Sequence, residues 1–245
     1  MSRLVMPVAA VAALVATVAF GARVQAANGG MTVRYVHVFT VNDAPAGAWD
    51  VYLGASRISG PFWPGAHTHP GAEYGVILTG QGARWNTGSG LTTVPEGGAF
   101  NTSPGIVHEG GNTSDADALQ LNTHILSAGG AFNVPAVPLP ADAPKATGKQ
   151  TVMYRVKFPM ATHPANPFKM TMEVLDFAAG SQVPSHVPPG AMLGVVVDGR
   201  LTVTQNGTTK TYDTGQGIQV DAGTSVSMAP ADGQPASVVV TAIAQ

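Results

Sequence analysis

The sequence predicts an all-β protein built from two similar units in tandem, and three observations lead to this prediction. Only 11% of the 245 residues are charged, whereas glycine (30) and proline (19) are abundant, which is typical of turn-rich β-proteins. Short segments of alternating apolar and polar residues recur along the chain, and no segment has a convincing helical period. The second half also repeats the glycine spacing of the first half.

The N-terminal residues predict a secretory signal peptide over residues 1–26. A short basic start, Met1–Arg3, precedes an almost wholly apolar stretch, and Val24-Gln25-Ala26 fits a small-residue cleavage site. An uncleaved anchor is the alternative, although Pro7 and the abundant alanine would make a weak permanent span. We therefore expect a mature chain that begins at or near Ala27 and is periplasmic or secreted.

The charge balance and the lack of cysteine exclude several function classes. Removing residues 1–26 removes two arginines and no acid, so the formal net charge of -2 becomes about -4. This balance argues against nucleic acid or an anionic membrane surface as a partner. The absence of cysteine excludes disulfides, thiol nucleophiles and cysteine-based zinc sites. The expected partner is a small-molecule substrate, with no nucleic acid and no membrane after signal cleavage; a homodimer is left open.

The alternating segments divide the mature chain into two sets of strands. The first set is expected at 31–41, 49–53, 74–78, 92–95, 99–102 and 118–126. Residues 128–150 are rich in proline, alanine and glycine and have no periodicity, so they form a linker or a strap across the first unit. The second set is expected at 151–158, 170–177, 192–197, 201–204, 217–220, 226–228 and 236–243. We therefore predict one domain over 27–127 and a second over 151–245.

One stretch of the first unit carries the strongest chemical signal, His67-Thr-His69-Pro-Gly-Ala-Glu73. In a β-strand, residues i and i+2 point to the same face, so the two imidazoles project side by side. Glu73 follows a Pro-Gly turn at the start of an apolar run, and a hairpin would bring its carboxylate back towards them. His108 offers a third imidazole downstream. Three imidazoles and one carboxylate suit a divalent first-row metal.

The stretch around the two histidines resembles the first cupin motif, in which His-x-His is followed after three residues by Glu and after six more by Gly. His67, His69, Glu73 and Gly80 match this pattern without a gap. The opening glycine, Gly60, stands one place early.

A later stretch resembles the second cupin motif. Gly97, Gly105, His108 and Asn112 match it, whereas Ser103 replaces the motif's proline. The resemblance implies a cupin-type barrel (a double-stranded β-helix, or jelly roll). It also implies one divalent transition metal held by His67, His69, Glu73 and His108, with Fe, Mn, Ni, Cu and Zn all open.

The second half overlays both motifs but lacks their chemistry. His186 takes the place of His67, whereas Pro188, Met192 and Val226 stand where His69, Glu73 and His108 stand. One histidine cannot hold a metal alone, so His186 is expected to be packed or on the surface. The chain therefore resembles a bicupin with one active and one degenerate barrel. The two barrels should superpose at the glycine pairs Gly80/Gly199 and Gly105/Gly223.

Other polar residues are weaker candidates. His124 alternates in phase with Gln120 and Asn122, so the three share a face, which is either the barrel interior or the outer surface. Glu109 should point away from the site because it is adjacent to His108. The remaining histidines and the aromatic residues near the motifs are expected to be structural or core residues: His37, His163, Phe62, Trp63, Tyr74, Trp85 and Phe100.

The predicted ligand set leaves one or two coordination positions open for O₂ or a chelating substrate. The resemblance implies several chemistries: dioxygenases of the quercetinase type, oxalate-degrading enzymes, germin-like proteins, isomerases, lyases and sugar binders. We favour an exported metal-dependent oxidoreductase, quercetin-dioxygenase-like, that acts on a small organic substrate, with Glu73 as ligand and proton acceptor. The alternatives are a non-catalytic periplasmic protein that binds a small molecule or metal, and a non-oxidative cupin lyase or isomerase.

Overall fold

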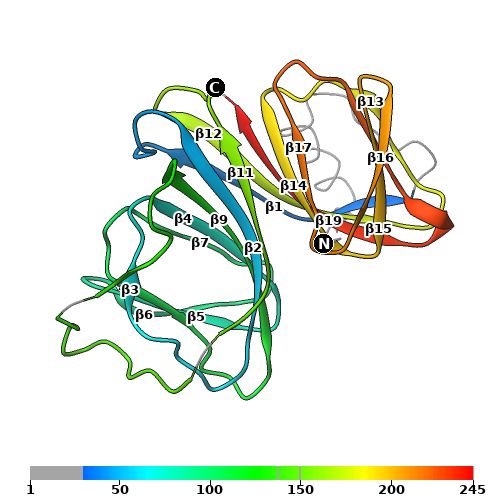
Figure 1. Ribbon diagram of the computed structural model, residues 1–245. Helices are drawn as coiled ribbons and strands as arrows, with labels where there is room; N and C mark the ends of the chain where they lie inside the picture. Colours follow the sequence, from blue (N-terminus) through cyan, green and yellow to red (C-terminus); the bar gives the residue numbers. More distant parts are fainter. Residues whose placement is uncertain (1–29, 137, 149, 245) are drawn as a thin grey trace, which may run out of the picture. The chain divides into compact units, whose positions relative to one another are not determined.

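The computed structural model describes residues 30–136, 138–148 and 150–244, and these residues form two compact units (Figure 1). We call residues 41–167 the first barrel, and residues 30–40 together with 168–244 the second barrel. The predicted signal peptide and cleavage site lie outside the described residues. Within those residues all regular structure is β, apart from the short 3-10 helix η1 (Ala231–Gly233), so the predicted all-β class is confirmed. No helix of the described part is long and apolar enough to cross a membrane.

The first barrel consists of two antiparallel sheets. One has the strand order β11-β2-β9-β4-β7, and the other has the order β10-β3-β8-β5-β6. The strands are β2 (Trp49–Ile58), β3 (His67–Thr68), β4 (Ala72–Thr79), β5 (Gly82–Asn86), β6 (Gly90–Val94), β7 (Ala99–Thr102), β8 (His108–Gly111), β9 (Ala118–Ser127), β10 (Val134–Pro135) and β11 (Thr151–Met160).

The second barrel has the same two-sheet plan. Its sheets have the orders β1-β12-β19-β14-β17 and β13-β18-β15-β16. The strands are β1 (Met31–Val41), β12 (Phe168–Phe177), β13 (Val183–His186), β14 (Ala191–Asp198), β15 (Arg200–Gln205), β16 (Thr208–Asp213), β17 (Gly217–Val220), β18 (Val226–Pro230) and β19 (Ala236–Ala244). The sequence pattern missed β13 and β16, which are short or polar.

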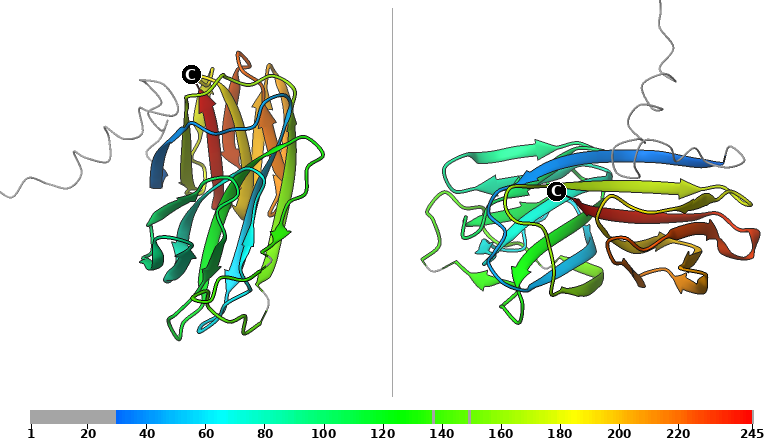
Figure 2. Two further views of the ribbon diagram at one scale, coloured as in Figure 1. Left: turned by 90° about the vertical axis from the view of Figure 1, so that its left-hand side faces the viewer. Right: turned by 90° about the horizontal axis from the view of Figure 1, so that it is seen from above.

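The predicted domain boundaries need one correction, because the first strand of each predicted domain belongs to the other barrel. Strand β1 lies beside β12, as Figure 2 shows, and its Met31 and Val33 pack against the core of the second barrel. Strand β11 instead pairs with β2 of the first barrel. An alternating pattern identifies a strand but does not specify the edge with which it pairs, so the pattern could not reveal this exchange.

The described residues of the segment 128–150 follow the strap alternative, because they lie against the first barrel. Strand β10 pairs with β3, and the backbone N–H of Thr147 donates to the carbonyl of Trp63 over 2.8 Å.

The internal repeat is visible in the backbone. Gly80 and Gly199 have φ values of 76° and 72°, and a Cβ at either position would lie 2.5 Å from a backbone oxygen of the strand-joining segment beside it. Gly71 and Gly190 form a second equivalent pair. A Cβ at Gly71 would lie 1.9 Å from the carbonyl oxygen of Ile125, and a Cβ at Gly190 would lie 1.9 Å from that of Ile243. These positions accept only glycine, which explains why the glycine spacing persists in both halves.

Strand registers confirm which residues replace the predicted ligands in the second barrel. His67 is paired with His108 in the first barrel, and His186 is paired with Val226 in the second. Met192 and Val226 are at most 1% exposed and belong to one apolar cluster that fills the second barrel. Apolar packing therefore occupies the space in which the first barrel carries polar groups.

One acid interrupts the apolar interior of the second barrel. Glu173 on β12 is in phase with Leu175 and Phe177, which belong to the apolar cluster, and it is 1% exposed. Neither of its carboxylate oxygens has a hydrogen-bond partner among the described residues. Burial without a partner disfavours the charged form and raises the pKa of Glu173 to about 8.

Folding stability should therefore fall as the pH rises from about 4.5 to about 8. Within this range the folded protein keeps the Glu173 proton, whereas the unfolded chain, with the ordinary pKa of 4.5, releases it. The slope from this group is at most about 1.4 kcal/mol per pH unit. Denaturant unfolding at pH 5 and pH 8 measures the effect. Glu173→Gln should flatten the pH dependence, and an unchanged dependence in that variant would contradict the assignment.

Candidate metal centre

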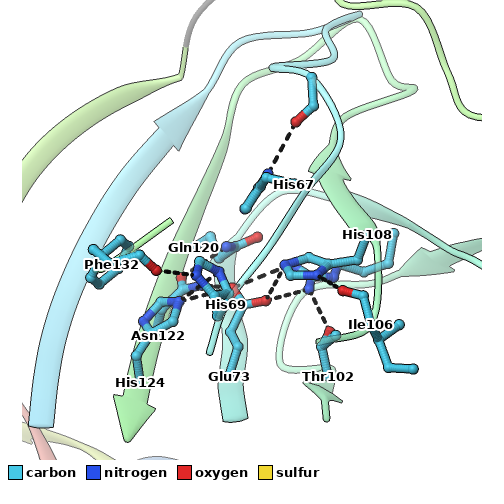
Figure 3. A network of polar contacts seen from close by, with 12 residues as sticks. His67, His69, Glu73, Thr102, Ile106, His108, Gln120, Asn122, His124 and Phe132 are labelled. Carbon is cyan, nitrogen blue, oxygen red and sulfur yellow. Dashed lines mark hydrogen bonds and ion pairs between the residues drawn. The ribbon is translucent and has the colours of Figure 1, made fainter. Parts of the chain in front are cut away.

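Three histidines of the first barrel come together at one end of its interior. His67 starts β3, His69 follows this strand, and His108 starts β8 as the register partner of His67. The ring centroids are 4.6–5.0 Å apart, and the ligand nitrogens of the three residues all lie within 4.8 Å of one another. Three of the four predicted ligands thus form a compact triad (Figure 3).

The backbone orients all three imidazoles in the same way. Each Nδ1 lies within hydrogen-bond distance of a carbonyl oxygen: His67 of Gly65 (3.0 Å), His69 of Phe132 (2.7 Å) and His108 of Ile106 (2.8 Å). A carbonyl can only accept, so each Nδ1 carries the proton and each Nε2 presents a lone pair. This arrangement, in which the second ring nitrogen is anchored, is the one that metal-binding histidines adopt.

Burial favours the neutral imidazoles that a metal requires. Burial lowers the pKa of His67, and it lowers the pKa of His69 to about 4. The Nε2 of His108 is buried without a hydrogen bond and lies 3.3 Å from Oε2 of Glu73. A buried imidazole nitrogen whose lone pair meets no donor fits a metal ligand, so the donor set fits a metal ion.

Glu73 lies beside the imidazoles as predicted, and it also has contacts that the sequence did not predict. Its carboxylate pairs with the buried guanidinium of Arg84, with Nη2–Oε2 at 2.5 Å and Nη1–Oε1 at 3.5 Å, and it also accepts a hydrogen bond from Asn122 Nδ2. Burial raises the pKa of Glu73, but the Arg84 guanidinium opposes burial and holds this pKa well below its usual range. Glu73 is therefore an ionised carboxylate that is already paired.

The polar face of β9 points into the barrel, which resolves the open alternative for this strand. His124 is the register partner of Glu73, and its Nε2 lies 3.3 Å from Nε2 of His69 and 3.6 Å from Oε1 of Glu73. Gln120 donates to Asn122 over 2.8 Å, and Asn122 donates to Glu73. His69, Glu73 and His124 form a second group of possible ligands that shares His69 with the first.

Sequence reasoning missed three residues at the site. Arg84 lies on β5 in an apolar segment, and Phe132 and Arg155 lie on the strap and on β11. The Phe132 ring packs 4.5 Å from the His124 ring, and the Arg155 guanidinium lies 3.7 Å above the Phe132 ring. A charged residue between apolar neighbours was the only available signal for Arg84.

A cavity of about 430 Å³ opens onto this cluster, and all of its lining residues belong to the first barrel. Its lining includes Phe132 and Arg155 together with the four histidines and the acid of the cluster: His67, His69, Glu73, His108 and His124. The volume is that of a small-molecule site.

The remaining candidates follow the structural interpretation. Glu109 is fully buried on the face of β8 away from the imidazoles and accepts a hydrogen bond from the backbone of Gly65. His163 stacks on Trp49 with ring centroids 3.5 Å apart. Of the aromatic residues near the motifs, three are buried: Phe62, Tyr74 and Trp85.

Known proteins share this architecture. Residues 59–124 match a family model of the Cupin domain. A single-residue variant of oxalate decarboxylase from Bacillus subtilis aligns with 86% of this chain and 77% of its own, at 12% identity and a TM-score of 0.55. A structure concerned with the Mn(II) centres of the same enzyme aligns equally far, at 13% identity and a TM-score of 0.53.

A second solved protein aligns over nearly its whole length. AerE from Microcystis aeruginosa covers 91% of this chain with 97% of its own, at 12% identity and a TM-score of 0.52. At such identities these structures establish the fold alone. No curated protein sequence matches the chain.

The triad geometry predicts one divalent ion per chain in the first barrel, with His nitrogens at about 2.0–2.2 Å from the ion. His108→Ala should abolish stoichiometric binding, measured by elemental analysis after metal loading and desalting. His186→Ala is the matched control, because His186 occupies the place of His67 in the second barrel, and it should retain full occupancy. Two ions per chain, or full occupancy in His108→Ala, would contradict this assignment.

Proposed function

We propose that this chain, a member of the cupin superfamily with a bicupin-like fold, is an exported metal-dependent oxidoreductase, dioxygenase-like, that acts on a small organic substrate. The observation that carries the proposal is the triad of anchored imidazoles that lines a cavity of about 430 Å³. His67, His69 and His108 would hold the ion. Imidazole suits Fe, Mn, Ni, Cu and Zn, so the donor set leaves the metal open.

A bound divalent ion would supply open coordination positions and Lewis acidity towards the oxygens of a chelating substrate. The protein side chains supply the rest. Glu73, kept ionised by Arg84, lines the cavity and is placed to accept a hydrogen bond from a substrate hydroxyl. Arg155 offers positive charge at the Phe132 ring and favours an anionic substrate. Phe132 covers His69 and His124 and limits their exposure to water.

A non-oxidative lyase is a second candidate. The oxalate decarboxylase that shares this fold acts on a small dianion, and Arg155 would suit such a substrate here. A periplasmic binding protein without catalysis is the third, since the same cavity could hold a ligand without turnover.

Turnover assays distinguish the three candidate functions: oxidoreductase, lyase and binding protein. Protein freed of metal and reloaded separately with Fe(II), Mn(II), Ni(II), Cu(II) or Zn(II) is mixed with the flavonol quercetin, as the phenolic probe, or with oxalate. Our proposal expects O₂ uptake with the phenolic in at least one metal form, lost in His108→Ala and kept in His186→Ala. Formation of formate and CO₂ from oxalate without net O₂ uptake would refute the oxidoreductase and support the lyase. Tight binding of quercetin or oxalate without turnover would refute the oxidoreductase and support the binding protein.

Export is part of the proposal and is supported by residues 1–26 of the sequence. Expression in a bacterial host with a secretory pathway should give a periplasmic protein whose N-terminus is at or near Ala27. N-terminal sequencing of the fractionated protein measures this. An intact Met1 on membrane-associated protein would favour the anchor.

A further inference from the structure

Arg84 is a buried cation whose main partner is one carboxylate, that of Glu73. It is 3% exposed on β5, where its register partners are Thr92 and Gly110. Its guanidinium donates to both oxygens of Glu73 and, over 2.9 Å, to Oγ1 of Thr102. The guanidinium carbon lies 4.1 Å above the centroid of the Phe100 ring. Such a pair is fixed in position by geometry as well as by charge.

The barrel is shaped around this guanidinium. A Cβ at Gly110 would lie 2.7 Å from Nη1 of Arg84, so a side chain there would displace it. A Cβ at Gly75 would lie 2.1 Å from the ring of Phe100, on which the guanidinium stacks. Neither glycine has a positive φ, so neither is required by a turn. These two glycines instead make room for Arg84 and its stacking partner.

The contacts of Glu73 leave it poorly placed as a metal ligand. Oε2 accepts from Arg84, and Oε1 accepts from Arg84 and from Asn122. The compact triad of ligand nitrogens consists of His67, His69 and His108. The Glu73 carboxylate lies 3.3 Å from Nε2 of His108 but groups with His69 and His124, and not with the whole triad. Coordination through Glu73 would have to share its oxygens with the bidentate ion pair to Arg84 and with Asn122.

We propose that this chain binds its metal through three histidines, His67, His69 and His108, and that Arg84 holds Glu73 beside the ion as a positioning residue. Glu73 then remains a charged acceptor that faces the cavity next to His124. The ligand assignment does not depend on turnover. The role of Glu73 as an acceptor for the substrate rests on the proposed function.

Cobalt(II) binding to the full-length mature protein tests the assignment, because the Co(II) absorption spectrum reports the number and type of ligands. His108→Ala should lower Co(II) affinity by more than the roughly 100-fold that bounds the loss of an outer contact. Glu73→Gln should lower affinity by no more than about 100-fold and should leave the spectrum unchanged, because its carboxylate is such an outer contact. A Glu73→Gln protein that changes its spectrum, or loses Co(II) as His108→Ala does, would overturn the proposal.

Releasing Glu73 supplies an independent readout. In Arg84→Met the carboxylate loses its partner and should bind the ion, so the spectrum should shift towards a higher coordination number. In the double variant Arg84→Met, Glu73→Gln the spectrum should return to that of the parent, and this variant carries no unpaired buried charge that would impair folding. An Arg84→Met spectrum identical to that of the folded parent would contradict the proposal. Failure of every substrate with intact Co(II) binding would refute the proposed oxidoreductase but not the ligand assignment.

Discussion

The interior of the first barrel depends on the pairing of two buried charges, Glu73 and Arg84. Either charge alone inside a β-barrel would carry a large desolvation penalty, which only a hydrogen-bonded partner offsets. The side chains of both residues are about 4% exposed. Each makes a further hydrogen bond, Glu73 from Asn122 and Arg84 to Thr102. The glycines of β4 and β8 and the ring of Phe100 are arranged around this pair. Through Asn122 the network continues to Gln120 on β9.

The second barrel shows the same scaffold without such a network. Met192 pairs with Ala242 where Glu73 pairs with His124, and Val226 pairs with His186 where His108 pairs with His67. Apolar side chains at equivalent register positions fill the space and remove the need for compensating charges. The glycines that turn the chain are retained, because the backbone geometry is independent of what the interior holds. Fold and chemistry are thus separable within a single chain.

Local rules explain what the sequence could predict. The alternation of side chains fixes His67 and His69 on one face, and turn glycines fix the spacing of both motifs. The overlay of the two halves identified Met192 and Val226 correctly because the overlay depends on those same glycines.

Long-range pairing explains what the sequence could not predict. The alternation of residues 31–41 is equally compatible with either barrel, and the exchange of β1 and β11 depends on which edges are free. The partner of Arg84 lies eleven residues away on another strand, and no periodicity relates the two.

Residues outside the motifs complete the site. The strap has no repeating pattern, yet the carbonyl of Phe132 fixes the tautomer of His69 and its ring packs against His124. Arg155, on the exchanged strand β11, stacks on the same ring. The motif histidines set where an ion can bind, and this requirement is common to many chemistries. Charge and access at the cavity are determined by Arg84, Phe132, His124 and Arg155, so the choice among reactions must depend on these residues.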